Sequence, residues 1–144
     1  MSGERTVELS LEQVADYEFR VRFDGTAAPD LATDESAPLG REAGPNPSRL
    51  LAAAVANCLC ASLLFALRKF GNGPHGLSAR ARATLQRNER GRWRIAHVAV
   101  DLRLGGAASA LAHLDRALAQ FEDFCIVTES VRQGRSACTM RTAR

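Results

Sequence analysis

The strongest constraint on this chain is an apolar run at residues 50–67, which only Asn57 and Ser62 interrupt. Asn46 and Pro47 stand just before it, and an asparagine cap followed by a proline is typical of a helix start. A helix that is apolar on almost every face belongs in the interior of a domain. The run therefore predicts a central buried helix with Cys58 near its midpoint. It should end within residues 70–74, where glycine favours a left-handed cap.

The same run is long enough to raise the possibility of a membrane span, which needs roughly 18 apolar residues. Much of its first half is alanine, and Asn57 would have no partner in hydrocarbon. Residues 1–16 are mixed and acidic, without the basic start and apolar core of a signal peptide. We therefore expect a cytoplasmic protein with no membrane partner. A membrane-inserted helix is the rival interpretation, and it predicts that the protein sediments with membranes.

The flanking sequence predicts an α+β domain that spans residues 1–144. Alternating apolar and polar residues indicate strands at 6–12, 17–23 and 30–33, followed by a loop at 37–45. After the helix, residues 77–85 and 93–104 alternate around a turn at 88–91 and predict a hairpin. Apolar residues at helical spacing predict a helix over 111–121, a short helical turn over 124–131 and a final strand over 135–141. The order is three strands, helix, two strands, helix, short helix and strand, with antiparallel sheets.

The charge pattern does not favour a nucleic-acid partner. The net charge is only +3, and the arginines of the predicted hairpin alternate along its strands, which places them on one solvated sheet face. A sheet that binds single-stranded nucleic acid needs interleaved aromatic side chains for base stacking, and only Trp93 is available there. We expect no nucleic-acid binding.

The spacing of the cysteines limits what they can do. Cys58 and Cys60 lie two residues apart on the predicted helix, so their side chains point about 200° apart and cannot bond each other or share one metal. The three histidines show no ligand spacing with any cysteine, so we predict no metal site and no cofactor. Cys125 follows the last long helix, and a helix–helix contact would bring it to Cys58 or Cys60. Cys138 lies in the predicted final strand.

Two interpretations of these thiols stay open. Free cysteine is often a small buried hydrophobe, and packing alone would account for it. A reactive thiol instead needs access and a nearby cation or helix N-terminus. Arg41 and Glu42, just upstream of the helix, are the candidates to supply an oriented guanidinium, and Arg132 is a second source.

Two segments resemble the OsmC/Ohr family, the osmotically inducible and organic hydroperoxide resistance proteins. The first runs from Gly44 through Asn46-Pro47 and the Leu-Leu-Ala-Ala-Ala stretch to Asn57-Cys58. The second runs from Phe124-Cys125 to Gly134, and the predicted helix and hairpin between them match the family order. The resemblance covers roughly residues 40–134.

The resemblance implies an OsmC-like fold, an intertwined homodimer and a thiol-dependent peroxidase that acts in the oxidative stress response. By position, Cys58 corresponds to the peroxidatic thiolate and Cys125 to the resolving thiol. The expected substrate is a small organic hydroperoxide held in an apolar pocket at the subunit interface, and the expected reductant is a dithiol. The alternative is a non-catalytic binding module that keeps this pocket and uses the cysteines for packing.

The sequence departs from the family pattern at three positions. Peroxidases of the family usually carry glutamate after the Asn-Pro pair, where it orients an arginine toward the thiolate, and Ser48 stands there instead. Ile126 replaces the proline that usually follows the second cysteine, and Cys60 is an additional thiol that we assign to packing. Arg41 is the candidate for the arginine, and Arg20 and Arg22 are poorer ones.

Overall fold

The computed structural model describes residues 3–134 and divides into two compact units, residues 1–50 and 51–144. The N-terminal unit is a three-stranded antiparallel sheet in the order β1-β2-β3. Its strands are β1 (Ser10–Ala15), β2 (Glu18–Arg22) and β3 (Leu31–Thr33). The first strand begins later than the predicted residue 6, because Ser10 pairs with Arg22, the last residue of β2. Residues before Ser10 therefore have no strand opposite them.

The loop after β3 is arranged around Asp34, which is only 3% exposed. Its carboxylate accepts hydrogen bonds from the backbone amides of Glu35, Arg41 and Ala43, at 2.8, 3.1 and 3.1 Å. These bonds hold the pKa of Asp34 below its ordinary value, with the Ala43 amide as the largest cause and burial opposing it. The loop then delivers the chain to Asn46, whose side chain accepts the Arg49 amide at 2.9 Å as a helix cap.

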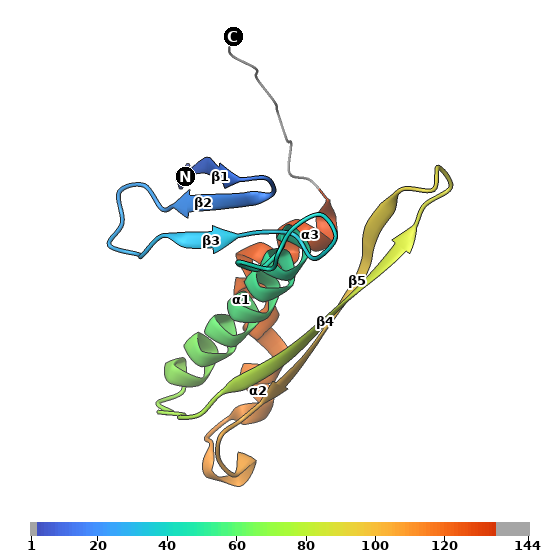
Figure 1. The fold of residues 1–144 in the computed structure, drawn as a ribbon. Helices are drawn as coiled ribbons and strands as arrows, with labels where there is room; N and C mark the ends of the chain where they lie inside the picture. The colour runs from blue at the N-terminus through green and yellow to red at the C-terminus, as the bar shows by residue number, and fades with distance from the viewer. Residues whose placement is uncertain (1–2, 135–144) are drawn as a thin grey trace. The chain divides into compact units, whose positions relative to one another are not determined.

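Helix α1 (Pro47–Lys69) confirms the predicted central helix and both of its ends (Figure 1). Gly71 has a φ of 79°, and its amide bonds to the carbonyl of Arg68 while that of Asn72 bonds to Leu67. This pair of bonds is the Schellman motif that glycine permits at a helix C-terminus. Arg68 and Lys69 in the last turn suit the negative pole of the helix.

One face of α1 forms the core of the second unit. Its buried residues recur at helical spacing and pack with residues of the C-terminal helices in one cluster: Val55, Leu59, Leu63, Ala66, Leu67, Ala117, Phe121 and Cys125. The opposite face is largely exposed among residues 3–134, and Phe65 there is 55% exposed. By length and composition α1 would also suffice to cross a membrane, a test that core helices pass as well.

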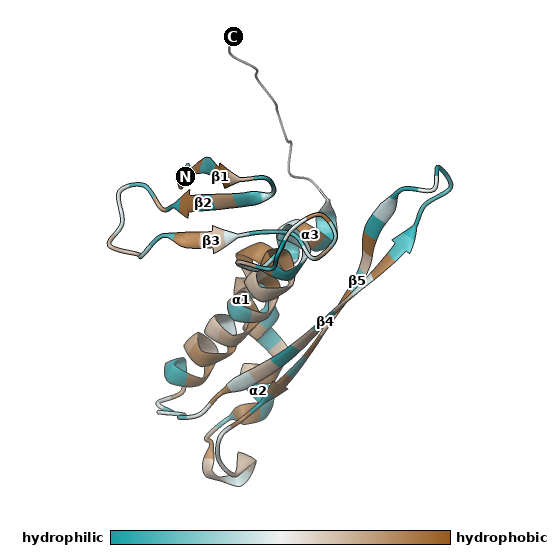
Figure 2. Cartoon of the chain, in the orientation of Figure 1, coloured by the Kyte–Doolittle hydropathy of each residue, from teal (hydrophilic) through white to brown (hydrophobic). Residues whose placement is uncertain are grey.

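Strands β4 (Ser78–Arg87) and β5 (Trp93–Arg103) form the predicted hairpin as a long twisted ribbon (Figure 1). On β5, Val98, Val100 and Leu102 pack against the core cluster, while Asp101 between two of them is exposed. Figure 2 shows the resulting alternation of hydrophobic and hydrophilic residues along the hairpin. The arginines of β4 are exposed, but so is every other residue of this strand except the half-buried Ala83, so β4 has no buried face in the described chain.

The C-terminal segment differs from the single helix predicted over 111–121. It contains η1 (Ala108–Ala110), α2 (Leu114–Gln120), η2 (Phe121–Phe124) and α3 (Ile126–Gln133). The helix starts only at Leu114 because the side-chain amide of Asn72 bonds both backbone groups of Ala112, each at 2.8 Å. The short helix after Cys125 is confirmed as α3, which ends at Gln133 with Gly134 as its C-cap. The predicted strand at 135–141, with Cys138, lies outside the described residues.

Candidate active site

Cys58 lies in the middle of α1, on the flank of its buried face. It is half-buried and packs against the core cluster, next to Leu59 in the chain and one turn from Val55 and Ser62. Cys60 is also half-buried but points to another side of the helix, as the spacing of two residues requires. Of the two, only Cys58 packs against the cluster that contains Cys125.

Cys125 is fully buried at the junction between η2 and α3. It is the N-cap residue of α3, and its amide bonds to the carbonyl of Glu122 at 2.9 Å while its carbonyl accepts the Glu129 amide at 3.1 Å. The thiol sulfur and the hydroxyl oxygen of Thr128 are hydrogen-bonded at a distance of 2.8 Å. The preceding Phe124 packs edge-on against Phe65 of α1, with ring centroids 5.4 Å apart. This contact packs the junction between η2 and α3 against α1.

The fold thus brings Cys58 and Cys125 together, and Cys58 meets the start of α3. Burial alone raises the pKa of Cys58, but hydrogen bonds outweigh it and lower this pKa below the ordinary value of 9.0. The donors to its sulfur are the Cys125 thiol, the backbone amides of Val127 and Thr128, and the Ser62 hydroxyl. Amides in the first turn of a helix favour a thiolate, because they are unpaired donors at the positive pole.

The pKa of Cys125 shifts in the opposite direction, above its ordinary value. Burial raises its pKa, and the hydrogen bond to Cys58 raises it further, while Thr128 opposes both effects. Burial also raises the pKa of Cys60. Among the described thiols, the structure therefore favours the thiolate at Cys58 and keeps the proton on Cys125. All three are free thiols.

Arg41 and Glu42 belong to the N-terminal unit, where they shape the loop around Asp34. Arg41 forms an ion pair with Glu18, and this pair raises the pKa of the guanidinium. Glu42 takes a left-handed backbone with a φ of 59°, and its amide donates to the carbonyl of Glu35 at 3.2 Å. A role for either residue at Cys58 stays a prediction.

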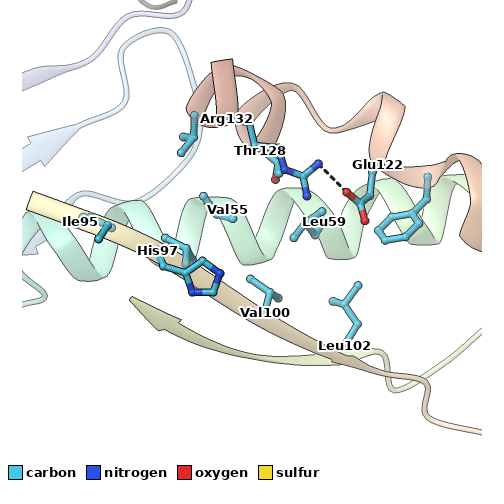
Figure 3. A pocket seen from close by; sticks show the side chains of 13 residues that line it. Val55, Leu59, Ile95, His97, Val100, Leu102, Glu122, Thr128 and Arg132 are labelled. Carbon is cyan, nitrogen blue, oxygen red and sulfur yellow. Dashed lines mark ion pairs between the residues drawn. The ribbon is translucent and has the colours of Figure 1, made fainter. Parts of the chain in front are cut away.

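A hollow of about 510 Å³ lies between α1, β5, η2 and α3 (Figure 3). Aliphatic and aromatic side chains from three elements line part of it: Val55, Leu59, Ile95, Val100, Leu102 and Phe121. His97, Glu122, Thr128 and Arg132 contribute the polar part of the lining. Thr128, which bonds Cys125, also lines it, so the hollow borders the thiol pair. Arg132 lies at the wall and pairs with Glu122 at 2.7 Å, as the dashed line in Figure 3 marks, and with Glu129 at 3.0 Å.

Sequence reasoning did not identify Ser62, Thr128 or Asp34. Ser62 stood out only as an interruption of the apolar run, and its spacing of four from Cys58 was the available signal. Thr128 sits three residues after Cys125, within reach of a helix cap residue, but that pattern is common. Within residues 3–134, no group of three or more His, Cys, Asp or Glu side chains is placed to hold a metal.

Comparisons with known proteins identify the family and the fold of this chain. The family described as OsmC-like protein matches residues 40–139. An OsmC-like protein of unknown function from Vibrio cholerae has a similar structure, with a TM-score of 0.71 and 16% identity over 88% of this chain and 94% of that one. The organic hydroperoxide resistance protein OsmC from Legionella pneumophila gives 0.65 and 15% over 91% and 92%.

OhrB, the organic hydroperoxide resistance protein of Bacillus subtilis, gives a TM-score of 0.62 and 17% identity over 89% of this chain and 91% of that one. No protein with a curated description matches the sequence. At these identities the structural likeness shows the shared α+β fold, and the sequence match spans more than half of the chain. The chain belongs to the OsmC-like protein family.

Proposed function

We propose that this protein is a thiol-dependent peroxidase that reduces organic hydroperoxides through Cys58 and Cys125. The observation that carries the proposal is the pairing of these two thiols at the start of α3, next to a hollow that is partly lined by apolar side chains. The pKa of Cys58 is lowered and that of Cys125 is raised, so one sulfur is prepared as a nucleophile and the other keeps its proton. The name of the similar proteins from Legionella pneumophila and Bacillus subtilis, organic hydroperoxide resistance protein, supports the same substrate class.

The reaction follows from thiol chemistry. The Cys58 thiolate attacks the terminal oxygen of the hydroperoxide, the O–O bond breaks, and the alkoxide takes a proton from water and leaves as the alcohol. Cys58 becomes a sulfenic acid, and Cys125 then attacks its sulfur, forming a disulfide and releasing water. An external dithiol restores both thiols by exchange and is itself oxidised to a disulfide. A reducing cytoplasm, which we propose as the location, supplies such dithiols.

The absence of glutamate at Ser48 does not remove thiolate stabilisation from this proposal. In the family pattern that glutamate orients an arginine, whereas the Cys58 sulfur here accepts bonds from the Val127 and Thr128 amides and from Ser62. A helix N-terminus is an established means of lowering a cysteine pKa. We therefore assign the activation of Cys58 chiefly to α3.

We also propose a homodimer. Within the described chain, β4 and β5 pair only with each other, and an isolated two-stranded sheet is marginally stable at best. Trp93 is 56% exposed and Phe65 55%, which leaves apolar surface for a second copy to cover. Light scattering after size exclusion should give twice the chain mass of 15.5 kDa. A species of 15.5 kDa at micromolar concentration would contradict the dimer.

The test of the proposed activity is consumption of cumene hydroperoxide with dithiothreitol as the reductant. Wild type and Cys60→Ser should consume the peroxide, and Cys58→Ser should lose essentially all catalysis. Cys60→Ser is the matched control because it changes a thiol on the same helix that does not face Cys125. Equal rates for wild type and Cys58→Ser, or no consumption by wild type with any dithiol, would contradict the proposal.

The alternative is a non-catalytic binding module, and Ser48 in place of glutamate is the observation that favours it. The hollow would then bind an apolar ligand, and the cysteines would serve packing. Labelling with a thiol reagent separates the two functions. Fast labelling of one thiol that peroxide abolishes supports the peroxidase, whereas uniformly slow labelling supports the binding module.

A further inference from the structure

We infer that the reductant attacks the Cys58 sulfur of the disulfide, so that the mixed disulfide forms on Cys58 and Cys125 is the thiol that leaves. Cys58 then receives both the peroxide oxygen and the reductant sulfur, and it receives them from the same side. This assignment rests on the proposed function for the existence of the Cys58–Cys125 disulfide, but thiol–disulfide exchange by itself permits attack at either sulfur.

Cys125 is enclosed by its own chain. It has no exposed surface and belongs to the core cluster, together with Phe121 of η2. Phe124, the residue before it, packs against Phe65 of α1 with ring centroids 5.4 Å apart. These contacts involve neither sulfur, so we expect them to keep Cys125 enclosed when the disulfide forms. A second copy in the proposed homodimer can only add cover to this position.

Cys58, in contrast, lies at the border between the buried and the exposed side of α1. Val55 and Ser62, one turn away on one flank, are buried. Ala54 and Ala61, one turn away on the other flank, are exposed. Residues three and four apart on a helix are neighbours, so these four side chains are the ones beside Cys58 within α1. The Cys58 thiol is therefore covered on one flank and has only methyl groups of α1 beside it on the other.

The stereochemistry of disulfide formation selects the same sulfur. Displacement at sulfur is in line, so Cys125 attacks the sulfenic sulfur of Cys58 from the side opposite the departing oxygen. The space vacated by this oxygen lies behind Cys58, on the axis of the new S–S bond. A thiolate must take that position to break the bond with Cys125 as the leaving group. A path that admits a hydroperoxide to Cys58 therefore leads the reductant to the same place.

The leaving-group preference opposes this assignment but is the smaller effect. A thiol of lower pKa leaves faster, and the pKa of Cys58 is lowered while that of Cys125 is raised. One pKa unit between two leaving thiols changes the exchange rate by about tenfold at most. Attack at Cys125 instead requires the core to open, and a core position is open for about one part in a thousand of the time or less. The Thr128 hydroxyl, 2.8 Å from the Cys125 sulfur, can also donate to that sulfur as it departs.

The reductive steps then balance as follows. One thiolate of a dithiol attacks Cys58, the S–S bond breaks, and its electron pair goes to the Cys125 sulfur, which takes a proton from water. The second thiol of the reductant attacks the reductant sulfur of the mixed disulfide and releases Cys58 as a thiolate. The dithiol is oxidised to its cyclic disulfide, and both protein sulfurs are reduced. The lowered pKa of Cys58 favours this second step, in which Cys58 is the leaving group.

A reductant with a single thiol traps the mixed disulfide and tests the assignment. A Cys60→Ser/Cys138→Ser protein is oxidised with diamide, which requires no peroxidase turnover, and is treated briefly with 2-mercaptoethanol. Acid quenching, alkylation with N-ethylmaleimide and peptide mass spectrometry locate the adduct at the earliest times. We expect the mercaptoethanol adduct on Cys58 to exceed that on Cys125 by about tenfold or more. A ratio near one or below, or failure of diamide to link the two cysteines, would overturn the inference.

The same disulfide-linked protein in concentrated urea is the control for access. Both sulfurs are exposed in the unfolded chain, so the ratio of the two adducts should fall to near one. An unchanged ratio in urea would show that burial does not set it, and this result also overturns the inference. Selective adduct formation on Cys58 supports the inference even if wild type consumes no peroxide, in which case only the peroxidase proposal falls. Adduct formation on Cys125 overturns it even if peroxide consumption is normal.

Discussion

The hydroxyl oxygen of Thr128 lies 2.8 Å from the sulfur of Cys125, at the buried start of α3. A hydroxyl and a thiol can each donate or accept. When Cys58 is a thiolate, the Cys125 hydrogen is directed to Cys58, and the Thr128 hydroxyl can donate to Cys125 instead. Thr128 is therefore placed to stabilise Cys125 at the moment when its sulfur must give up its proton.

We predict that Thr128→Val slows the formation of the disulfide and leaves the first oxidation nearly unchanged. Valine has the shape of threonine but no hydroxyl, so the pKa of Cys125 should rise further above its ordinary value. The sulfenic acid should persist several-fold longer, which dimedone trapping and mass spectrometry measure. Thr128→Ser keeps the hydroxyl and serves as the control. Equal trapping in wild type and Thr128→Val would show that Thr128 has no part in resolution.

The three described thiols should titrate in a set order. The pKa of Cys58 is lowered from 9.0 by hydrogen bonds that outweigh burial, while burial raises that of Cys125 and Cys60. Alkylation depends on the thiolate, so labelling of Cys58 should reach its half-maximal rate below pH 9.0 and that of Cys60 above it. Site-resolved mass spectrometry across a pH series measures both. Labelling of Cys60 at lower pH than Cys58 would contradict the assigned roles.

Asp34 should make the stability of the protein depend on pH in the acid range. Its pKa is lowered in the folded state, so its contribution is present above the unfolded value of 3.8 and is lost as pH falls through the folded value. Asp34→Asn should reduce the free energy of unfolding at pH 7, because an amide cannot accept from three backbone donors as a carboxylate does. The difference from wild type should shrink below about pH 4. Urea unfolding at pH 7 and pH 3 tests this, and an equal difference at both pH values would contradict it.

Leu67 should be among the most sensitive core positions, since it is fully buried on α1. Leu67→Ala removes buried methyl groups and leaves a cavity, which typically costs about 2–5 kcal/mol. Leu118→Ala, on a side chain that is 47% exposed, should cost about 0.5 kcal/mol or less. Urea unfolding of both variants measures the contrast. Similar losses for the two would show that the α1 cluster is not the core of this unit.

The sequence predicted those parts of the fold that depend on local pattern. The bounds of α1 followed from Asn46, Pro47 and Gly71, and the hairpin followed from alternation. The continuous helix over 111–121 was wrong because Asn72, distant in the chain, holds the backbone of Ala112. Such a tertiary hydrogen bond leaves no periodic signal.

The residues of the candidate site were likewise predicted only in part. Cys58 and Cys125 were identified from their positions in two recognisable segments. The groups around them were not identified, because spacings of three and four residues, as between Cys125 and Thr128 or Cys58 and Ser62, are common in helices. The approach of the Val127 and Thr128 amides to Cys58 depends on tertiary packing, which leaves no local signal. The ion pair of Arg132 with Glu122 likewise joins two elements, α3 and η2.

The central claim is that Cys58 and Cys125 of one chain exchange oxidising equivalents. Reduced protein treated with one equivalent of cumene hydroperoxide and mapped by non-reducing peptide mass spectrometry tests it directly. We predict a Cys58–Cys125 disulfide within the chain, and a trapped sulfenic acid at Cys58 in the Cys125→Ser variant. Oxidation that leaves Cys58 as a free thiol, or that links Cys58 to any cysteine other than Cys125, would contradict the account.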